Sequence, residues 1–263
     1  MPSKSQLPRF ILASGVTNLA DGVAVVVWAW VATLLTRDPF FVALMPVALR
    51  LPWFVFALPA GIVTDRVDRR KLIFCMDSVR AFAFAGAAFA VLLSLPLADP
   101  VETGTAMPGL FAALIGCALV VGTAEVFRDN AAQTMLPAFV PHDQLEKANG
   151  RLWSVELVGN TLLGPAIGAF LIAAMAWLPF ATNAFAFAVA AFLIIGIKGA
   201  FTPEVRDTRN WRAELGEGLS YLKNAPLLRL LAVVTGLWNL FDQMVVIALV
   251  LYEIGRASCR ERV

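Results

Sequence analysis

Two long apolar segments of the sequence each carry a hydroxyl, an amide and a carboxylate at one shared spacing. The first copy comprises Ser14, Asn18 and Asp21. The second copy comprises Thr235, Asn239 and Asp242. Both lie in a repeated G-x-x-N-L-x-D pattern, and the spacing i, i+4, i+7 places each set on one face of a helix. A carboxylate on such a face could bind a proton or face a substrate.

The composition of the 263-residue chain predicts that these polar stripes belong to a membrane protein. Hydrophobic residues make up 59% and charged residues 15%, with a mean hydropathy of +0.75, which is too apolar for a soluble domain. A bilayer core about 30 Å thick takes roughly 20 helical residues. The stretches that could cross it are 10–36, 40–64, 72–95, 107–127, 153–175, 179–197 and 227–252. We therefore expect an all-α membrane protein.

The distribution of basic residues predicts the orientation of these spans. With the N-terminus inside, the inner segments hold Lys4, Arg9, Arg66, Arg69, Arg70, Lys71, Lys147, Arg151, Lys198, Arg206, Arg209, Arg212 and Lys223. The outer connections hold Arg37 beside Asp38, Asp99 and Glu102. The positive-inside rule then predicts a cytoplasmic N-terminus in an inner (plasma) membrane.

Asp21 is the first candidate for a functional group inside the membrane. It follows Arg9 by ~12 residues, or roughly 18 Å along a helix, which is close to mid-membrane. A carboxylate there costs several kcal/mol unless it is neutral, paired or facing water. Arg50 lies at a similar depth and is the expected partner, in either a proton- or substrate-binding pair or a structural ion pair. Glu125 and Glu156 are weaker candidates, because they lie nearer the cytoplasmic ends of their spans.

The repeat also predicts how the spans are organised. An offset of six spans, an even number, makes the first and seventh spans cross the membrane in the same direction. This relation is typical of a parallel six-plus-six repeat whose halves are related by an axis along the membrane normal. The two stripes would then line one central cavity from the first helix of each half.

The connection between the second and third spans carries the most specific motif, GIVTDRVDRRKLI. It resembles the signature loop of the major facilitator superfamily, G-x-x-x-D-R-x-G-R-R/K, and the matching residues are Gly61, Asp65, Arg66, Arg69 and Arg70. Asp68 stands at the usual glycine, where a tight turn can require a left-handed conformation that Asp tolerates. The resemblance implies about 12 spans in two bundles and a conformational latch at Asp65. A simple positive-inside anchor is the alternative, and it would not need Gly61 or Asp65.

Other stretches are similar to one branch of that superfamily, the enterobactin-exporter and macrolide-efflux branch of drug:proton antiporters. These stretches are 51–70 and 127–150. GNTLLGPAIGA, residues 159–169, is similar to the antiporter motif of the superfamily, with matches at Gly164, Pro165 and Gly168 and with Asn160 and Ala169 in place of glycines. Small residues and a proline also allow close helix packing and a bend, so packing alone is the alternative.

The resemblance implies a secondary transporter that exports amphipathic molecules such as drugs, macrolides or siderophores in exchange for protons. Protonation of Asp21, and of Asp242, would favour one conformation, and Asp21→Asn would abolish efflux with folding intact. Trp28, Trp30 and Trp238 could line an apolar cavity, although aromatic residues in spans more often face lipid or other helices.

The expected partners are the cargo, protons and the lipid bilayer, with a monomer when full length. No nucleic-acid partner, metal, cofactor or enzymatic activity is expected, because no ligand spacing, nucleophile–base pair or phosphate loop is present. A seven-span receptor is an alternative, but it leaves the Gly61 loop unexplained. A truncated half that dimerises, or serves as a membrane scaffold, is another.

The predicted domain order ends in a segment unlike the rest. Residues 1–197 form a six-span half, 198–226 a cytoplasmic linker with an amphipathic helix, and 227–252 the first span of a second half. The final EIGRASCRERV breaks that span, and its back-translation resembles the read-through of a sequencing-library adapter. We expect 253–263 to be an assembly artefact and the chain to be a C-terminally truncated fragment. The alternative is a natural basic tail, which a genomic stop codon after Val263 would establish.

Overall fold

A computed structural model describes residues 6–199, 201–202 and 211–260. The chain divides into two compact units, residues 1–205 and 206–263. Throughout the described residues the regular structure is helical, apart from one isolated bridge between Thr36 and Val101. The prediction of an all-α protein is therefore confirmed.

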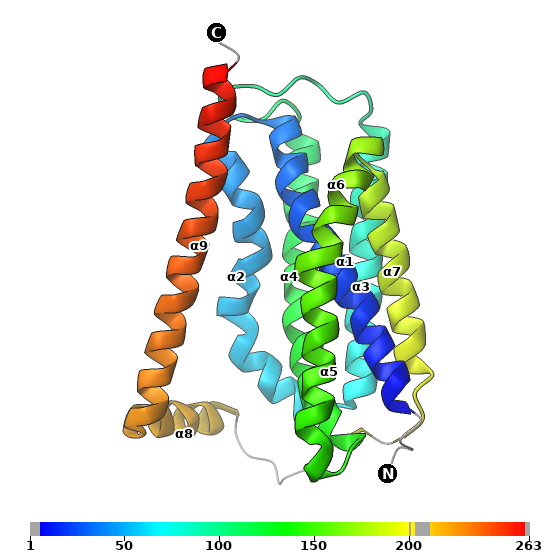
Figure 1. Cartoon of the computed structure of the whole chain (residues 1–263), viewed down its shortest axis with the longest axis vertical. Coiled ribbons are helices and arrows are strands. Elements are labelled where there is room, and N and C mark those ends of the chain that lie inside the picture. Colours follow the sequence, from blue (N-terminus) through cyan, green and yellow to red (C-terminus); the bar gives the residue numbers. More distant parts are fainter. Residues whose placement is uncertain (1–5, 200, 203–210, 261–263) are drawn as a thin grey trace. The chain divides into compact units, whose positions relative to one another are not determined.

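The first unit is a bundle of six helical spans, each long and apolar enough to cross a membrane (Figure 1). Four spans are single helices: α1 (Leu7–Leu35), α2 (Pro39–Thr64), α3 (Arg69–Leu93) and α7 (Leu178–Ile195). The span of α4 (Pro108–Met135) continues into the short helix η2 (Leu136–Ala138). The remaining span begins with η3 (His142–Gln144) and continues through α5 (Leu145–Leu157), η4 (Val158–Leu163) and α6 (Gly164–Ala174). These six spans confirm the predicted set before residue 198.

Two spans are longer than predicted, and charged residues explain the difference. The sequence ends the fourth span at Phe127 because Arg128 and Asp129 follow, whereas α4 continues to Met135. Arg128 is buried there and has acidic partners, so its charge does not end the apolar segment. The fifth span begins at His142 instead of Trp153, through the polar first turns of α5.

The fifth span changes its helical winding next to a proline. Val158–Leu163 forms the π-helix η4, and Pro165 follows at the start of α6. A proline lacks the N–H that would bond to the preceding turn. Wider π-helical turns are a known accommodation within α-helices and are frequent at functional sites.

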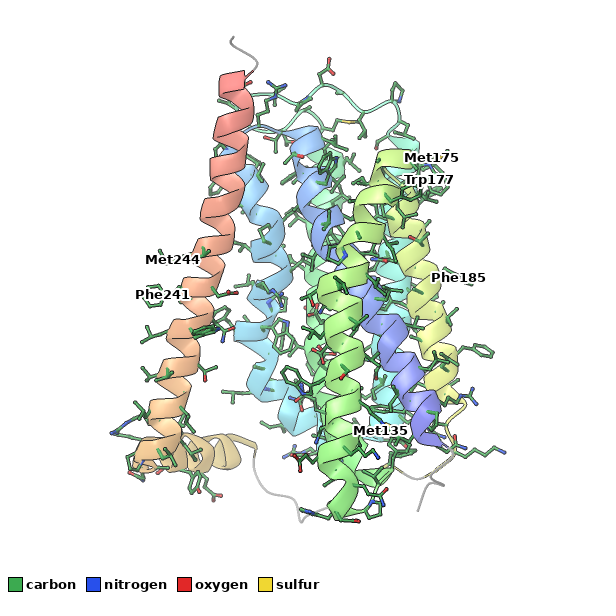
Figure 2. All side chains as sticks on the ribbon, in the orientation of Figure 1. Met135, Met175, Trp177, Phe185, Phe241 and Met244 are labelled. Carbon is green, nitrogen blue, oxygen red and sulfur yellow. The ribbon has the colours of Figure 1, made fainter. Side chains whose placement is uncertain are left out.

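Aromatic packing joins α1, α3 and α7 at the centre of the bundle. The ring of Trp28 lies 5.6 Å from that of Phe84 and 5.0 Å from that of Phe180, between centroids. The outer surface is also apolar, and Figure 2 shows Phe185 of α7 pointing away from the bundle, whereas Met135 is fully buried. Between helices in a bilayer, van der Waals packing of this kind replaces the hydrophobic effect as the main attraction.

The second unit consists of α8 (Trp211–Asn224) and α9 (Pro226–Arg260). Gly216–Asn224 and Pro226–Asp242 meet at a bend of 96°, and the pair qualifies as a further span when counted together. The predicted seventh span lies within α9, which continues past residue 252 to Arg260. The artefactual origin of 253–263 and the parallel relation of the halves stay predictions. Of the expected apolar side of α8, Trp211, Leu215 and Leu219 fall outside the residues whose side chains are described.

Candidate functional site

The polar stripes are helical in both units, as their spacing predicts. In α1 the Asn18 side-chain amide donates a hydrogen bond to the Ser14 carbonyl at 2.8 Å. In α9 the Asn239 amide donates to the Thr235 carbonyl, also at 2.8 Å. Each amide thus satisfies part of its hydrogen-bonding capacity within its own helix, which is a common way to carry a polar residue in a span.

A cavity of about 250 Å³ lies beside the α1 stripe, within the first unit. It is lined from α1, α2, α4, α5 and η4. Its polar residues are Asn18, Asp21, Arg50, Glu125, Asp129, Gln133, Glu156 and Asn160. Its apolar residues are Ala24, Val25, Trp28, Leu49, Trp53 and Val121. The structure therefore brings Asn18, Asp21 and Arg50 together, and it adds Glu125 and Glu156, which the sequence ranks lower.

The expected ion pair between Asp21 and Arg50 is wrong. Asp21 instead accepts a hydrogen bond from Arg80 of α3, whose side chain is fully buried. The Arg80 guanidinium also lies over the Phe187 ring, 3.9 Å from its centroid, in a favourable cation–π contact. Arg50 pairs with Glu125 at 3.9 Å, and its side chain is 60% exposed. Equal depth along two helices does not determine which way their side chains point, so depth alone selected the wrong arginine.

A second buried cluster lies around Arg128 of α4. Its guanidinium is 3.7 Å from Asp77 of α3 and 3.1 Å from Asp129. It also donates a 3.5 Å hydrogen bond to the Ser14 hydroxyl, the first member of the α1 stripe. The sequence analysis missed Asp77, Arg80 and Arg128. The signal was present, because Asp77 and Arg80 interrupt the predicted third span, and ionisable residues within spans mark functional or paired positions.

The antiporter-like motif packs directly against α1 beside Asp21. A Cβ atom added at Gly164 would lie 2.5 Å from the Cα atom of Gly22. One added at Gly22 would lie 2.6 Å from the carbonyl oxygens of Gly159 and Asn160. Gly168 faces Val23 in the same way, and Pro165 is partly buried between these glycines. The glycines thus have a packing role, since only their lack of a side chain lets the two backbones approach this closely.

The signature-like loop connects several helix ends in the first unit. Asp65 lies 3.8 Å from Arg69 and has an exposed side chain. Arg69 donates to the Thr134 carbonyl at 3.0 Å, and Arg70 donates to the Ile197 carbonyl at 2.7 Å. These bonds satisfy a carbonyl in the last turn of α4 and one just beyond the end of α7, where cations are also favoured by the helix dipole. The arginines therefore do more than anchor the loop by charge.

The other loop positions refine the sequence prediction. Asp68 is the N-cap of α3, with φ of −63°, and its side chain accepts a 3.2 Å bond from the Lys71 backbone N–H. Asp68 is therefore not there to adopt a left-handed turn. Its role is to cap the N-terminus of α3. Arg66 is exposed, and a Cβ at Gly61 would meet nothing within 4 Å among the described residues.

The second stripe belongs to the other unit. Within that unit Asn239 and Asp242 are exposed. Trp238 is exposed as well. Of the tryptophans predicted to line a cavity, Trp28 lines the cavity beside Asp21, whereas Trp30 is exposed on another face of α1.

The comparison with known families gives a match over most of the chain. The family described as transmembrane secretion effector, a division of the major facilitator superfamily, matches residues 2–253. No curated protein shows a significant match. The matched region includes α1 to α7, α8 and most of α9, and it agrees with the superfamily that the Gly61 loop predicts.

Proposed function

Because the chain belongs to the transmembrane secretion effector family of the major facilitator superfamily, we propose that it exports amphipathic small molecules in exchange for protons. The family and the spans identify a multi-pass membrane transport protein. Proton coupling, the direction of transport and the cargo are the proposed part. Export is supported by the likeness of residues 51–70 and 127–150 to the enterobactin-exporter and macrolide-efflux branch. The basic inner connections support an inner (plasma) membrane location with a cytoplasmic N-terminus.

The cavity beside Asp21 is the observation that carries the proposal. Its wall contains Asp21, Glu125, Asp129 and Glu156 within a membrane-spanning bundle. Ionised carboxylates at that depth are costly unless they are paired or solvated, and a bound proton removes the cost. A cavity with several such groups can therefore exist in charged and neutral forms, which proton-coupled transport requires.

Glu125 and Glu156 are better placed than Asp21 to carry the proton. A proton on Asp21 would leave the buried Arg80 without its carboxylate, and breaking a buried pair in this way costs about 3–5 kcal/mol. Glu125 makes one ion pair among the described residues, a long 3.9 Å contact to the exposed Arg50. No ion pair of Glu156 is found among the described residues. Asp21 then keeps α1 attached to α3, while the glutamates change protonation state.

In the proposed alternating-access cycle, α1 moves together with the helices that contact it. Asp21 attaches α1 to α3, and Ser14 attaches it to Arg128 of α4. The glycine contacts place the π-helical turn η4 against the same part of α1. A change of winding at η4 would therefore displace α1 together with the cavity wall. The Asp65 loop is proposed as the latch, with Asp65 available to bond to the start of a helix in the other half.

The test is transport by the full chain in proteoliposomes with an imposed pH gradient. Ethidium, Nile red and anilinonaphthalene sulfonate serve as cationic, neutral and anionic cargo. We expect Glu125→Gln and Glu156→Gln each to reduce gradient-driven flux of the transported dye at least tenfold. Glu102→Gln is the matched control, because Glu102 is exposed outside the cavity. Gradient-driven flux that survives the double glutamine variant would exclude these residues as proton carriers.

A further inference from the structure

An apolar groove lies on the first unit, on the opposite side of α4 from the cavity beside Asp21. It has a volume of about 430 Å³ and is lined from the last turn of α2, from α3 and from α4. Val120 and Phe127 of α4 line the groove, whereas Val121 and Glu125 line the cavity. Helical periodicity places these two sets on opposite sides of α4. The groove is therefore a separate site.

The lining of the groove suits a hydrocarbon chain. Eight of its nine lining residues are apolar. The ninth, Thr123, already donates its hydroxyl to the Leu119 carbonyl at 2.7 Å. Val120 is 45% exposed, so the groove is open to the surroundings of the bundle, which in a membrane are acyl chains. A polar ligand would find no partner along the groove, whereas a chain gains van der Waals contacts there.

The groove also has the length and direction of an acyl chain. On α3 its lining runs from Leu72 to Val79, ~7 residues or roughly 10 Å along the helix axis. On α4 it runs from Phe127 to Leu119, ~8 residues or roughly 12 Å. A hydrocarbon core about 30 Å thick gives each leaflet roughly 15 Å. The groove thus follows the helices through most of one leaflet.

The end of the groove at the connection between α2 and α3 is basic. Leu72 lines this end and follows the exposed Lys71 in the first turn of α3. The connection and that first turn together hold four basic and two acidic residues. Both acidic residues are engaged locally, because Asp65 lies 3.8 Å from Arg69 and Asp68 caps α3. An acidic headgroup therefore complements the charge at this end.

We propose that the groove binds one acyl chain of an acidic phospholipid, whose headgroup phosphate lies beside Lys71. The chain fills the groove along α3 and α4, and the basic end selects the headgroup by its charge. The bound chain supports α4 from the side opposite to Glu125. The inference goes beyond the proposed export function, because it assigns a lipid site that α4 separates from the cavity.

The experiment places the full chain in phosphatidylcholine nanodiscs that contain a small fraction of phosphatidylglycerol with a photoactivatable diazirine in its acyl chain. The comparison probe is phosphatidylcholine with the same diazirine, and mass spectrometry identifies the cross-linked peptides. We expect the glycerol probe to label residues 72–79 and 119–127 at least threefold more than the choline probe does. Around the exposed Phe185 of α7 the two probes should label equally. The same ratio of the two probes at both places would overturn the inference.

Two matched pairs of variants test the chain and the headgroup separately. Val120→Trp fills the groove and should reduce its labelling at least fivefold, whereas Val55→Trp, at an exposed position of α2 outside the groove, should leave it unchanged. Lys71→Gln should remove most of the preference for phosphatidylglycerol, whereas Lys198→Gln, at an exposed position beyond the end of α7, should retain it. Undiminished groove labelling in Val120→Trp, or an undiminished preference in Lys71→Gln, would also overturn the inference.

Discussion

In α1 the residues Ser14, Asn18 and Asp21 contact packed neighbours, whereas in α9 Asn239 and Asp242 are exposed within their own unit. Both copies make the same 2.8 Å amide bond to the preceding turn. Only the α1 copy, among the described residues, has a basic partner for its aspartate. The local sequence thus determines the helix and the stripe, while the neighbouring helices determine whether the carboxylate is part of a site.

The largest expected difference between the two copies concerns their aspartates. Asp21→Asn should lower the free energy of unfolding by about 3–5 kcal/mol, because it leaves the Arg80 guanidinium buried without its charged partner. Asp242→Asn should leave the free energy of unfolding unchanged, because Asp242 is exposed within its own unit. SDS-induced unfolding of the full chain in mixed micelles, followed by circular dichroism, measures both. The structure thereby changes the earlier expectation that Asp21→Asn leaves folding intact.

A double variant tests the cause of that loss. Asp21→Asn combined with Arg80→Met removes both charges, and it should recover most of the stability because no charge remains buried without a partner. Equal losses for Asp21→Asn and Asp242→Asn would contradict the different surroundings assigned to the two copies. A double variant as unstable as Asp21→Asn would show that the loss comes from packing instead.

Glycines at equivalent positions of the repeat should give effects of opposite sign. A Cβ added at Gly15 would lie 2.7 Å from Cγ1 of Val155, whereas one at Gly236 would meet nothing within 4 Å. Gly15→Ala should therefore cost about 1–3 kcal/mol through overpacking. Gly236→Ala should instead stabilise α9 by up to about 1 kcal/mol through helix propensity.

Hydrogen exchange of α1 and α9 peptides, read by mass spectrometry, reports each effect locally. Gly116→Ala in α4 is the control, because a Cβ there also meets nothing within 4 Å. Faster exchange in α1 for Gly15→Ala and slower exchange in α9 for Gly236→Ala are expected. The same sign of change at both glycines would show that the two helices are packed alike.

The smallest difference is expected for the asparagines, because their local hydrogen bonds are the same. Asn18→Ala and Asn239→Ala each remove one bond to a preceding carbonyl, and the higher helix propensity of alanine offsets part of the loss. Each should change the free energy of unfolding by less than about 1 kcal/mol. The same SDS unfolding measurement applies. A much larger loss for Asn18→Ala would show that its role in the cavity extends beyond this bond.

Particular residues show how far sequence reasoning reached. The apolar runs identified the six spans of the first unit, because an apolar stretch of that length with few charges indicates a membrane-spanning helix. The Gly61 loop identified the superfamily, because its residue types and spacing are specific. The partner of Asp21 was wrong, since Arg50 and Arg80 both lie in spans and rotation about a helix axis cannot be read from depth. The predicted fourth span ended too early. A charged residue such as Arg128 indicates the end of a span in the sequence, whereas in the structure its acidic partners allow it to be buried within α4.

The sequence by itself determined that the chain is a helical membrane protein, where most of its spans lie, and which helix faces are polar. Hydropathy and helical periodicity are properties of neighbouring residues, so they need no knowledge of the packed bundle. Only the tertiary structure decided that Arg80 holds Asp21 and that Glu125 and Glu156 share its cavity. It also decided that Gly164 meets Gly22. Those contacts join residues far apart in the chain, and they depend on the rotation and close approach of whole helices.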